Sequence, residues 1–136
     1  MIRRAVLPAA CLAALAGCGA SGPDPEVVAE AAQLTGVRVP PGAEVLGAQC
    51  ERGQDVMCKI AVAVGPGDVE ALLGASGVVV ALEPGRAVSL PPVDGVAVGA
   101  DVASAQEEVG TGAFREILVD RSDPARSVLH VWGYTT

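Results

Sequence analysis

Few side chains in this sequence have the chemistry of a catalyst or a metal ligand. His130 is the only histidine, and the four cysteines are Cys11, Cys18, Cys50 and Cys58. A structural zinc site takes four ligands from cysteine, histidine and carboxylate groups, and the last two cysteines lack the C-x-x-C spacing of a redox motif. We therefore expect no metal site and no cofactor.

A hydrolase is the enzyme class that the available residues come nearest to supporting. It needs a serine, a histidine and a carboxylate that converge, and Glu116 or Asp120 would have to pair with His130 across a hairpin. No serine stands in the G-x-S-x-G context that exposes a nucleophile at a strand-to-helix turn. We predict that the protein is not an enzyme, and keep a small extracytoplasmic hydrolase that uses His130 as the alternative function.

Three other groups of residues invite a binding interpretation but favour a structural one. Asp120, Ser122 and Asp123 offer oxygens, yet calcium takes six to eight of them, and two arginines share this loop. Residues 65–67 (Gly-Pro-Gly) lack the lysine and the spacing of a P-loop, so they predict a turn. The pair at residues 107–108 (Glu-Glu) predicts a solvated helix face.

Three ring-bearing side chains alternate near the C-terminus. His130, Trp132 and Tyr134 share one face of a predicted strand, and Leu129 and Val131 share the other. If the two aliphatic residues face the core, the three rings form a stripe on the outer face, and aromatic residues are common in binding hot spots. The alternative is that Trp132 fills a core with few other large side chains, and we favour this second interpretation.

The N-terminus has the layout of an export signal. Arg3 and Arg4 precede an apolar run over residues 5–16, which is shorter than the roughly 20 residues of a permanent membrane span. Small residues follow the run, as a signal peptidase requires. The pattern predicts a cleaved signal peptide over residues 1–17.

The end of this signal, Leu15-Ala16-Gly17-Cys18, resembles the lipobox of bacterial lipoproteins. The resemblance implies a diacylglyceryl thioether on Cys18, cleavage between Gly17 and Cys18, and acylation of the new amino group, with palmitate as an acyl chain. Two chains are enough for stable anchoring, so we expect the extracytoplasmic face of the cell membrane. The remainder of the chain is similar in general character to small, uncharacterised actinobacterial lipoproteins.

Three alternatives to this interpretation are weaker. Residues 14–16 (Ala-Leu-Ala) also form an A-x-A site for ordinary secretion. Cys11 would be a second lipidation site, but it would cut the apolar run in half and follows Pro8 closely. Arg3 and Arg4 suggest twin-arginine export, although paired arginines are common in any signal.

The mature chain would hold a tether over residues 18–23 and a single domain over residues 24–136. Losing Arg3 and Arg4 lowers the formal charge from −7 to −9, and an acidic body argues against nucleic acid as a partner. We expect a monomer whose partners are the membrane, through the lipid anchor, and an envelope protein. The predicted function is that of an exported accessory or binding lipoprotein.

Two cysteines remain once the signal is removed and Cys18 is lipidated. Cys50 and Cys58 then predict a disulfide, because exported proteins meet an oxidising compartment. Residues 44–51 and 56–64 read as two strands around a turn, and pairing Cys50 with Cys58 brings their apolar sets to one face. In this register Leu46 shares the face of Cys50, and Lys59 lies on the opposite, solvated face.

The other elements follow from caps, breakers and apolar runs. Asp24, Pro25 and Gly36 delimit a first helix, and Asp68 begins a second. Strands are predicted over residues 77–83, which would be central, and over residues 87–90, 115–120 and 127–134; residues 100–109 predict either a helix or an irregular loop crossing the sheet. The fold class is α+β: a small antiparallel sheet of four or five strands with two or three short helices, or alternatively a small β-sandwich.

Overall fold

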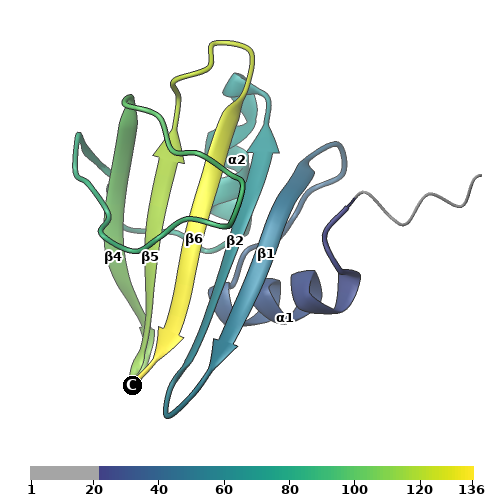
Figure 1. The fold of residues 1–136 in the computed structure, drawn as a ribbon. Helices are drawn as coiled ribbons and strands as arrows, with labels where there is room; N and C mark the ends of the chain where they lie inside the picture. The colour runs from purple at the N-terminus through teal and green to yellow at the C-terminus, as the bar shows by residue number, and fades with distance from the viewer. Residues whose placement is uncertain (1–21) are drawn as a thin grey trace, which may run out of the picture.

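The computed structural model describes residues 22–136, so the predicted signal peptide and the lipobox residues Leu15, Ala16, Gly17 and Cys18 lie outside it. The described chain forms one six-stranded antiparallel sheet in the order β1-β2-β6-β5-β4-β3, with two α-helices (Figure 1). Between residues 22 and 136 no helix has the length and apolar character needed to cross a membrane. The strands are β1 (Glu44–Arg52), β2 (Val56–Val64), β3 (Glu83–Pro84), β4 (Val102–Gly110), β5 (Ala113–Asp120) and β6 (Ser127–Thr135).

The first helix, α1 (Pro25–Thr35), begins and ends where its capping residues predict. Asp24 accepts a 2.9 Å hydrogen bond from the backbone nitrogen of Glu26, and Pro25 takes the first helical position. Gly36 ends the helix with a φ of 73°, a left-handed value that suits glycine. The second helix, α2 (Val69–Ala75), follows a short 3₁₀ turn, η1 (Pro66–Asp68).

The predicted hairpin between β1 and β2 is confirmed, with Cys50 directly opposite Cys58. One side chain departs from the predicted parity. The register shifts between Val45 and Gly47, so Leu46 packs on the opposite face of the sheet from Cys50. An extra residue in one strand reverses the facing of its neighbours, which is why strict alternation placed Leu46 wrongly.

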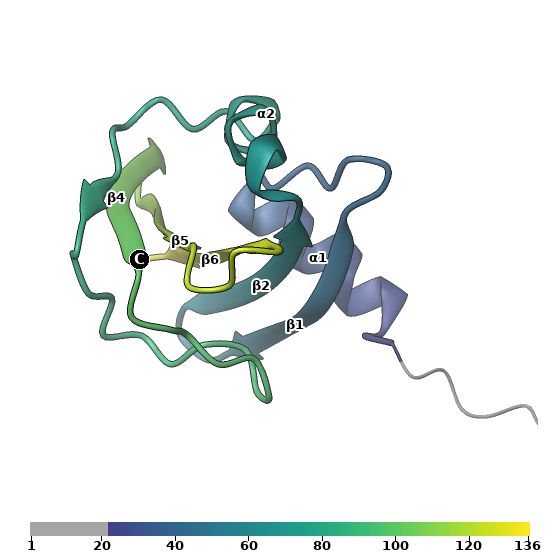
Figure 2. The same cartoon turned by 90° about the horizontal axis from the view of Figure 1, so that it is seen from above.

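Both α-helices cover the same face of the sheet, as Figure 2 shows. The core on this side consists of β-branched and leucine side chains from β2, β5 and β6, closed by residues of α1 and α2. Its largest fully buried members are Ile60, Val62, Leu72, Ile117, Val119, Leu129 and Val131. Burying such side chains contributes about 1.5–3 kcal/mol each to folding, so this layer is the main source of stability.

An irregular segment covers the other face. Residues 85–101, which we call the strap, run from β3 to β4 and cross the sheet on the side away from both helices (Figures 1 and 2). Val93 and Val96 of the strap pack on Ala61 and Ala63 of β2. The molecule therefore has three layers: two helices, the sheet and the strap.

The structure corrects the predictions for the middle of the chain. Residues 77–83 do not form a central strand: Val78, Val80 and Leu82 touch the core, but Val79 is 90 % exposed and β6 occupies the sheet centre instead. Residues 87–90 belong to the strap, and residues 100–109 lie largely in β4. Pairing with β5 overrides the helical propensity of alanine, glutamine and glutamate there.

These corrections also change the architecture. The single sheet excludes the β-sandwich alternative for residues 22–136, and its six strands exceed the predicted four or five. The two α-helices agree with the predicted two or three. The result is a sheet-dominated fold in which β2, β5 and β6 form the centre.

Candidate functional site

The predicted aromatic stripe lies on the face of the sheet that the strap crosses, and the strap contacts Trp132. His130 and Trp132 are each 1 % exposed, and Tyr134 is half-buried. The two buried rings stack with centroids 6.0 Å apart, and the Trp132 indole donates a 2.8 Å hydrogen bond to the Pro91 carbonyl oxygen. His130 and Trp132 therefore form no exposed binding surface, and the interpretation of Trp132 as a core residue is confirmed.

His130 has no polar partner within the described chain. Neither of its ring nitrogens makes a hydrogen bond, and burial lowers its pKa, with the charge of Asp120 opposing that change only in part. Glu116 instead binds Arg86 over 2.9 Å, and pairs in register with Trp132. The residues named for a hydrolase are thus not assembled around His130.

The oxygens named for a calcium site are already engaged. Burial on its own would raise the pKa of Asp120, but hydrogen bonds donated by the Ser122 hydroxyl and by the backbone nitrogens of Gly99 and Ser122 lower it overall. Asp123 accepts a 2.8 Å hydrogen bond from the backbone nitrogen of Ala125. This loop therefore has the bonding of a turn that closes the β5–β6 hairpin and holds the end of the strap.

Two cations secure the strap to the sheet. Lys59, predicted to be solvated, is 7 % exposed and donates a 3.2 Å hydrogen bond to the Pro91 carbonyl oxygen. The side-chain hydrogen bond to Glu116 raises the pKa of Arg86 against the opposing effect of burial, and Arg86 also donates to the hydroxyl of Ser104. Lys59 lies on the predicted face, but the strap takes that face out of solvent.

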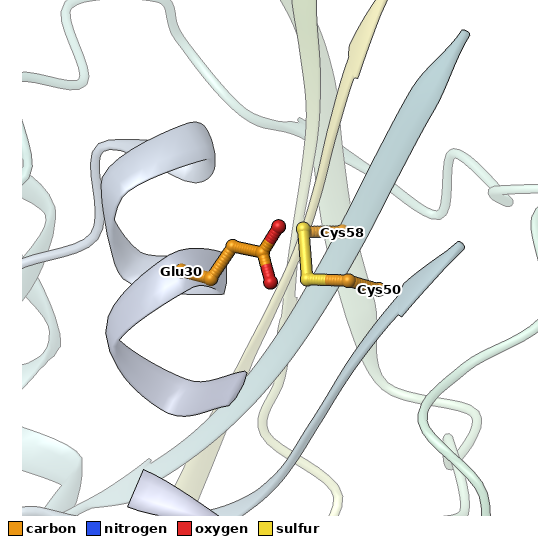
Figure 3. Close-up of side chains that lie close together, drawn as sticks. All are labelled: Glu30, Cys50 and Cys58. Atoms are coloured by element: carbon orange, nitrogen blue, oxygen red, sulfur yellow. A yellow bond between two sulfur atoms is a disulfide. The ribbon is translucent and has the colours of Figure 1, made fainter. Parts of the chain in front are cut away.

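On the helix side, the predicted disulfide joins Cys50 to Cys58. The Glu30 carboxylate of α1 points towards it, and one ligand atom from each of the three residues lies within 4.8 Å of the others (Figure 3). Three such residues would resemble part of a metal site, but metal-binding cysteines are thiolates. Sulfurs joined to each other are not available, so this cluster is a disulfide with a carboxylate beside it.

The disulfide begins a row of residues in register across the sheet. Cys50 pairs with Cys58, Cys58 with Gly133, Gly133 with Arg115, and Arg115 with Glu107. Paired residues point to the same face, so the whole row lies on the helix-facing side of the sheet, and α1 packs over its members in β1, β2 and β6. Glu107 is part of β4 and belongs to this row, which corrects its prediction as a solvated helical residue.

Gly133 lets α1 approach the sheet closely. A Cβ atom at this position would lie 3.0 Å from the Leu34 carbonyl oxygen and 3.1 Å from the Thr35 Cα atom. The end of the helix therefore rests directly on the backbone of β6. A glycine inside a strand often marks such an approach, so Gly133 is the sequence signal for the close contact between α1 and β6.

Arg115 then holds the end of α1 in place. Its Nη1 atom donates 2.9 Å hydrogen bonds to the carbonyl oxygens of Thr35 and Ser76, and its Nε and Nη2 atoms each lie 2.8 Å from a Glu107 carboxylate oxygen. The Arg115 side chain is 4 % exposed. All three guanidinium nitrogens are thus engaged within the protein.

A groove remains beside this contact, between the second half of α1 and the ends of the strands. Its volume is about 510 Å³, within the range of small-molecule sites. Its polar side chains are Glu30, Gln33, Thr35 and Arg115, and the others are mostly apolar: Leu34, Val56, Cys58, Val109 and Ala113. We call it the α1 groove. Sequence patterns did not identify it, because its residues come from four elements that meet only in the folded chain.

Comparisons of the chain with protein-family models, curated proteins and solved structures found no match. The candidate site is therefore defined by the geometry of this chain. Among the described residues, the α1 groove combines a concave shape, an apolar lining and charged side chains, which are the features expected of a ligand site.

Proposed function

We propose that this protein is an exported lipoprotein, anchored in the cell membrane through Cys18, that binds a component of the cell envelope in the α1 groove. The observation that carries the binding role is the groove itself, about 510 Å³ in volume and lined by Leu34, Val56, Val109 and Ala113. Apolar lining with few polar groups is typical of binding sites rather than of solvated surface.

Export is supported by two independent features. The Leu15-Ala16-Gly17-Cys18 motif resembles a lipobox, and the disulfide between Cys50 and Cys58 is of a kind that persists in oxidising compartments. The domain also begins soon after Cys18, since α1 starts at Pro25. A short tether of this kind keeps the groove near the membrane surface.

The geometry favours binding over the alternative of a hydrolase built on His130. A general base must reach its reacting group within hydrogen-bond distance, but His130 is 1 % exposed, and its cross-strand neighbour Ala61 packs against Val93 of the strap. Neither Glu116 nor Asp120 bonds to it. The α1 groove, by contrast, is open to solvent next to Val109, which is 45 % exposed.

The proposal can be tested by crosslinking in whole cells. A photoreactive amino acid at Val109, on the rim of the groove, should trap an envelope component that mass spectrometry can identify. The matched control places the same amino acid at Val79, which is 90 % exposed and outside the groove lining. Ala113→Phe, which fills the groove from β5, should abolish the Val109 product without affecting the disulfide or the secretion of the chain.

Two results would contradict the binding role. One is that Val109 and Val79 yield the same products in equal amounts. The other is that Ala113→Phe, shown to be folded by circular dichroism, leaves the Val109 product unchanged.

A further inference from the structure

We infer that the α1 groove binds an organic cation: a molecule with an apolar body and one primary amine or guanidinium group. This inference rests on the proposed function, because it names the chemistry of the ligand for the same groove. It follows from three features of the groove: the placement of Glu30, the internal pairing of Arg115 and the end of α1.

Glu30 supplies the recognising charge. Its carboxylate points from α1 towards the disulfide, inside the lining of the groove (Figure 3). Among residues 22–136 its one charged partner is Arg52, an exposed side chain of β1 with 66 % of its surface accessible. Exposed ion pairs contribute little, so a ligand cation that enters the groove can replace Arg52 at the carboxylate.

Arg115 does not supply a competing site for an anion. Its positive charge is balanced by Glu107, and its nitrogens are directed to Glu107 and to the carbonyl oxygens of Thr35 and Ser76. An anionic ligand would have to displace these buried hydrogen bonds, which are costly to leave unmade. The guanidinium is therefore a structural part of the wall.

The helix adds to the preference for a cation. The C-terminal end of an α-helix carries partial negative charge on its carbonyl groups, and the last turn of α1 contains no basic residue. Leu34 and Gly36 of this end line the groove. With Arg115 and Glu107 neutralising each other, the formal charge left in the groove lining is that of Glu30, whose partner Arg52 lies outside the lining.

The rest of the lining accommodates an apolar body. Val56, Val109 and Ala113 belong to three different strands and form the side of the groove that faces α1. Removing apolar ligand surface from water at this wall stabilises the bound state. The ion pair between the ligand cation and Glu30 then orients the ligand, and contact between its apolar body and the strands supplies affinity.

Three probes that share a phenyl ring test the inference: 2-phenylethylamine, 2-phenylethanol and phenylacetate. They are titrated into the full chain, in lipid nanodiscs if it is lipidated, and backbone amide signals of Gly36 and Ala113 are followed by NMR. The amine should shift both signals and bind about tenfold more tightly than phenylacetate, a difference of roughly 1.4 kcal/mol. The alcohol should fall between them.

Charge variants locate the cation. Glu30→Gln should weaken amine binding about fivefold and leave the alcohol unchanged, because only an ionic hydrogen bond is lost. Glu26→Gln removes the same charge from the exposed first turn of α1 and should change nothing. Arg52→Ala should strengthen amine binding about twofold, since it removes the competing cation.

The inference is overturned if phenylacetate binds as tightly as the amine. It is equally overturned if the Glu30→Gln and Glu26→Gln variants bind the amine with equal affinity. It is also overturned if no probe shifts Gly36 or Ala113. Those results leave the proposed function standing when the Val109 crosslink is still formed and is blocked by Ala113→Phe. If the amine binds but no specific crosslink is formed in cells, the cation site is supported and the envelope-binding role is contradicted.

Discussion

Trp132 donates a hydrogen bond from its indole Nε1 to the carbonyl oxygen of Pro91, a residue 41 positions earlier in the chain, over 2.8 Å. Lys59 donates to the same oxygen over 3.2 Å. Two neighbouring strands, β6 and β2, thus hold the middle of the strap at one atom. This contact explains why a face without helices contains buried side chains.

Trp132→Phe should lower the free energy of unfolding by about 2 kcal/mol, because it removes the indole donor and part of the ring volume. Tyr134→Phe is the matched control on the same face: its hydroxyl accepts an exposed hydrogen bond from Gln106 and should contribute less than about 0.5 kcal/mol. Urea unfolding followed by circular dichroism measures both. Equal stability of the two variants would show that the Pro91 contact does not hold the strap.

The stability of the domain should fall as the pH drops below about 6.5 because of His130. Burial lowers the pKa of this side chain in the folded state, so the unfolded chain binds the proton more readily. The contribution of neutral His130 to the free energy of unfolding is therefore complete above the pKa of the unfolded chain. It is lost as the pH falls from there towards the pKa of the folded state, with a slope of at most about 1.4 kcal/mol per pH unit. Asp120, whose pKa is also lowered, acts only below its ordinary value of 3.8.

Unfolding free energies between pH 7.5 and pH 5 isolate the histidine. His130→Leu, which cannot be protonated, should have a flatter profile than the wild type across that range. A wild-type profile as flat as that of His130→Leu would contradict the buried, neutral histidine.

Arg115→Met should destabilise the domain by about 3 kcal/mol, because it leaves the Glu107 carboxylate, 11 % exposed, without its cation. It also removes the donor to the carbonyl oxygens of Thr35 and Ser76. Glu107→Gln keeps an acceptor for the guanidinium and should cost only about 1 kcal/mol. Thermal and urea unfolding compare the two, and a larger loss for Glu107→Gln would argue against this division of roles.

Replacing both Cys50 and Cys58 with alanine should lower the free energy of unfolding by about 2.5 kcal/mol, as loop-closure entropy predicts for a small loop. The reductant dependence of wild-type unfolding should disappear in this variant. Mass spectrometry after alkylation without reductant should find neither cysteine labelled in the native protein. Labelling of both would show that the disulfide is not formed in the cell.

Cys18→Ala should release the protein from the membrane if Cys18 carries the anchor. The wild-type chain should partition into the detergent phase of a Triton X-114 extraction, and the variant into the aqueous phase, since the acyl chains supply the membrane affinity. Mass spectrometry of the wild-type N-terminus should show a diacylglycerol-modified Cys18. An unmodified N-terminus at Gly17 would contradict the lipoprotein assignment.

Features that depend on neighbouring residues were predicted well. The caps of α1 at Asp24 and Gly36 follow from local hydrogen bonding and backbone conformation. The β1–β2 and β5–β6 hairpins follow from strand runs separated by turn residues, and the pairing of Cys50 with Cys58 follows from side-chain parity. Each of these needs only a short stretch of chain.

Features that depend on distant partners were not predicted. Residues 78–82 have the composition of a strand, but no strand pairs with them and they pack against the core as an extended segment. Residues 102–110 have the composition of a helix, but β5 offers them a ladder of hydrogen bonds that is regular up to Glu108. Composition sets a weak preference, and the availability of a partner decides the outcome.

Alternation along the chain predicts which side chains share a face: Cys58 and Ile60 on one side of β2, and His130 and Trp132 together on one side of β6. What covers each face depends on the packing of distant segments. The strap buries His130 and Trp132, and the end of α1, resting on Gly133, leaves the groove beside Glu30. Alternation along a strand has a period of two residues, so a short stretch of sequence predicts the face to which each side chain points. Which segment covers that face depends on contacts between residues far apart in the chain, such as the hydrogen bond between Trp132 and Pro91, 41 positions apart.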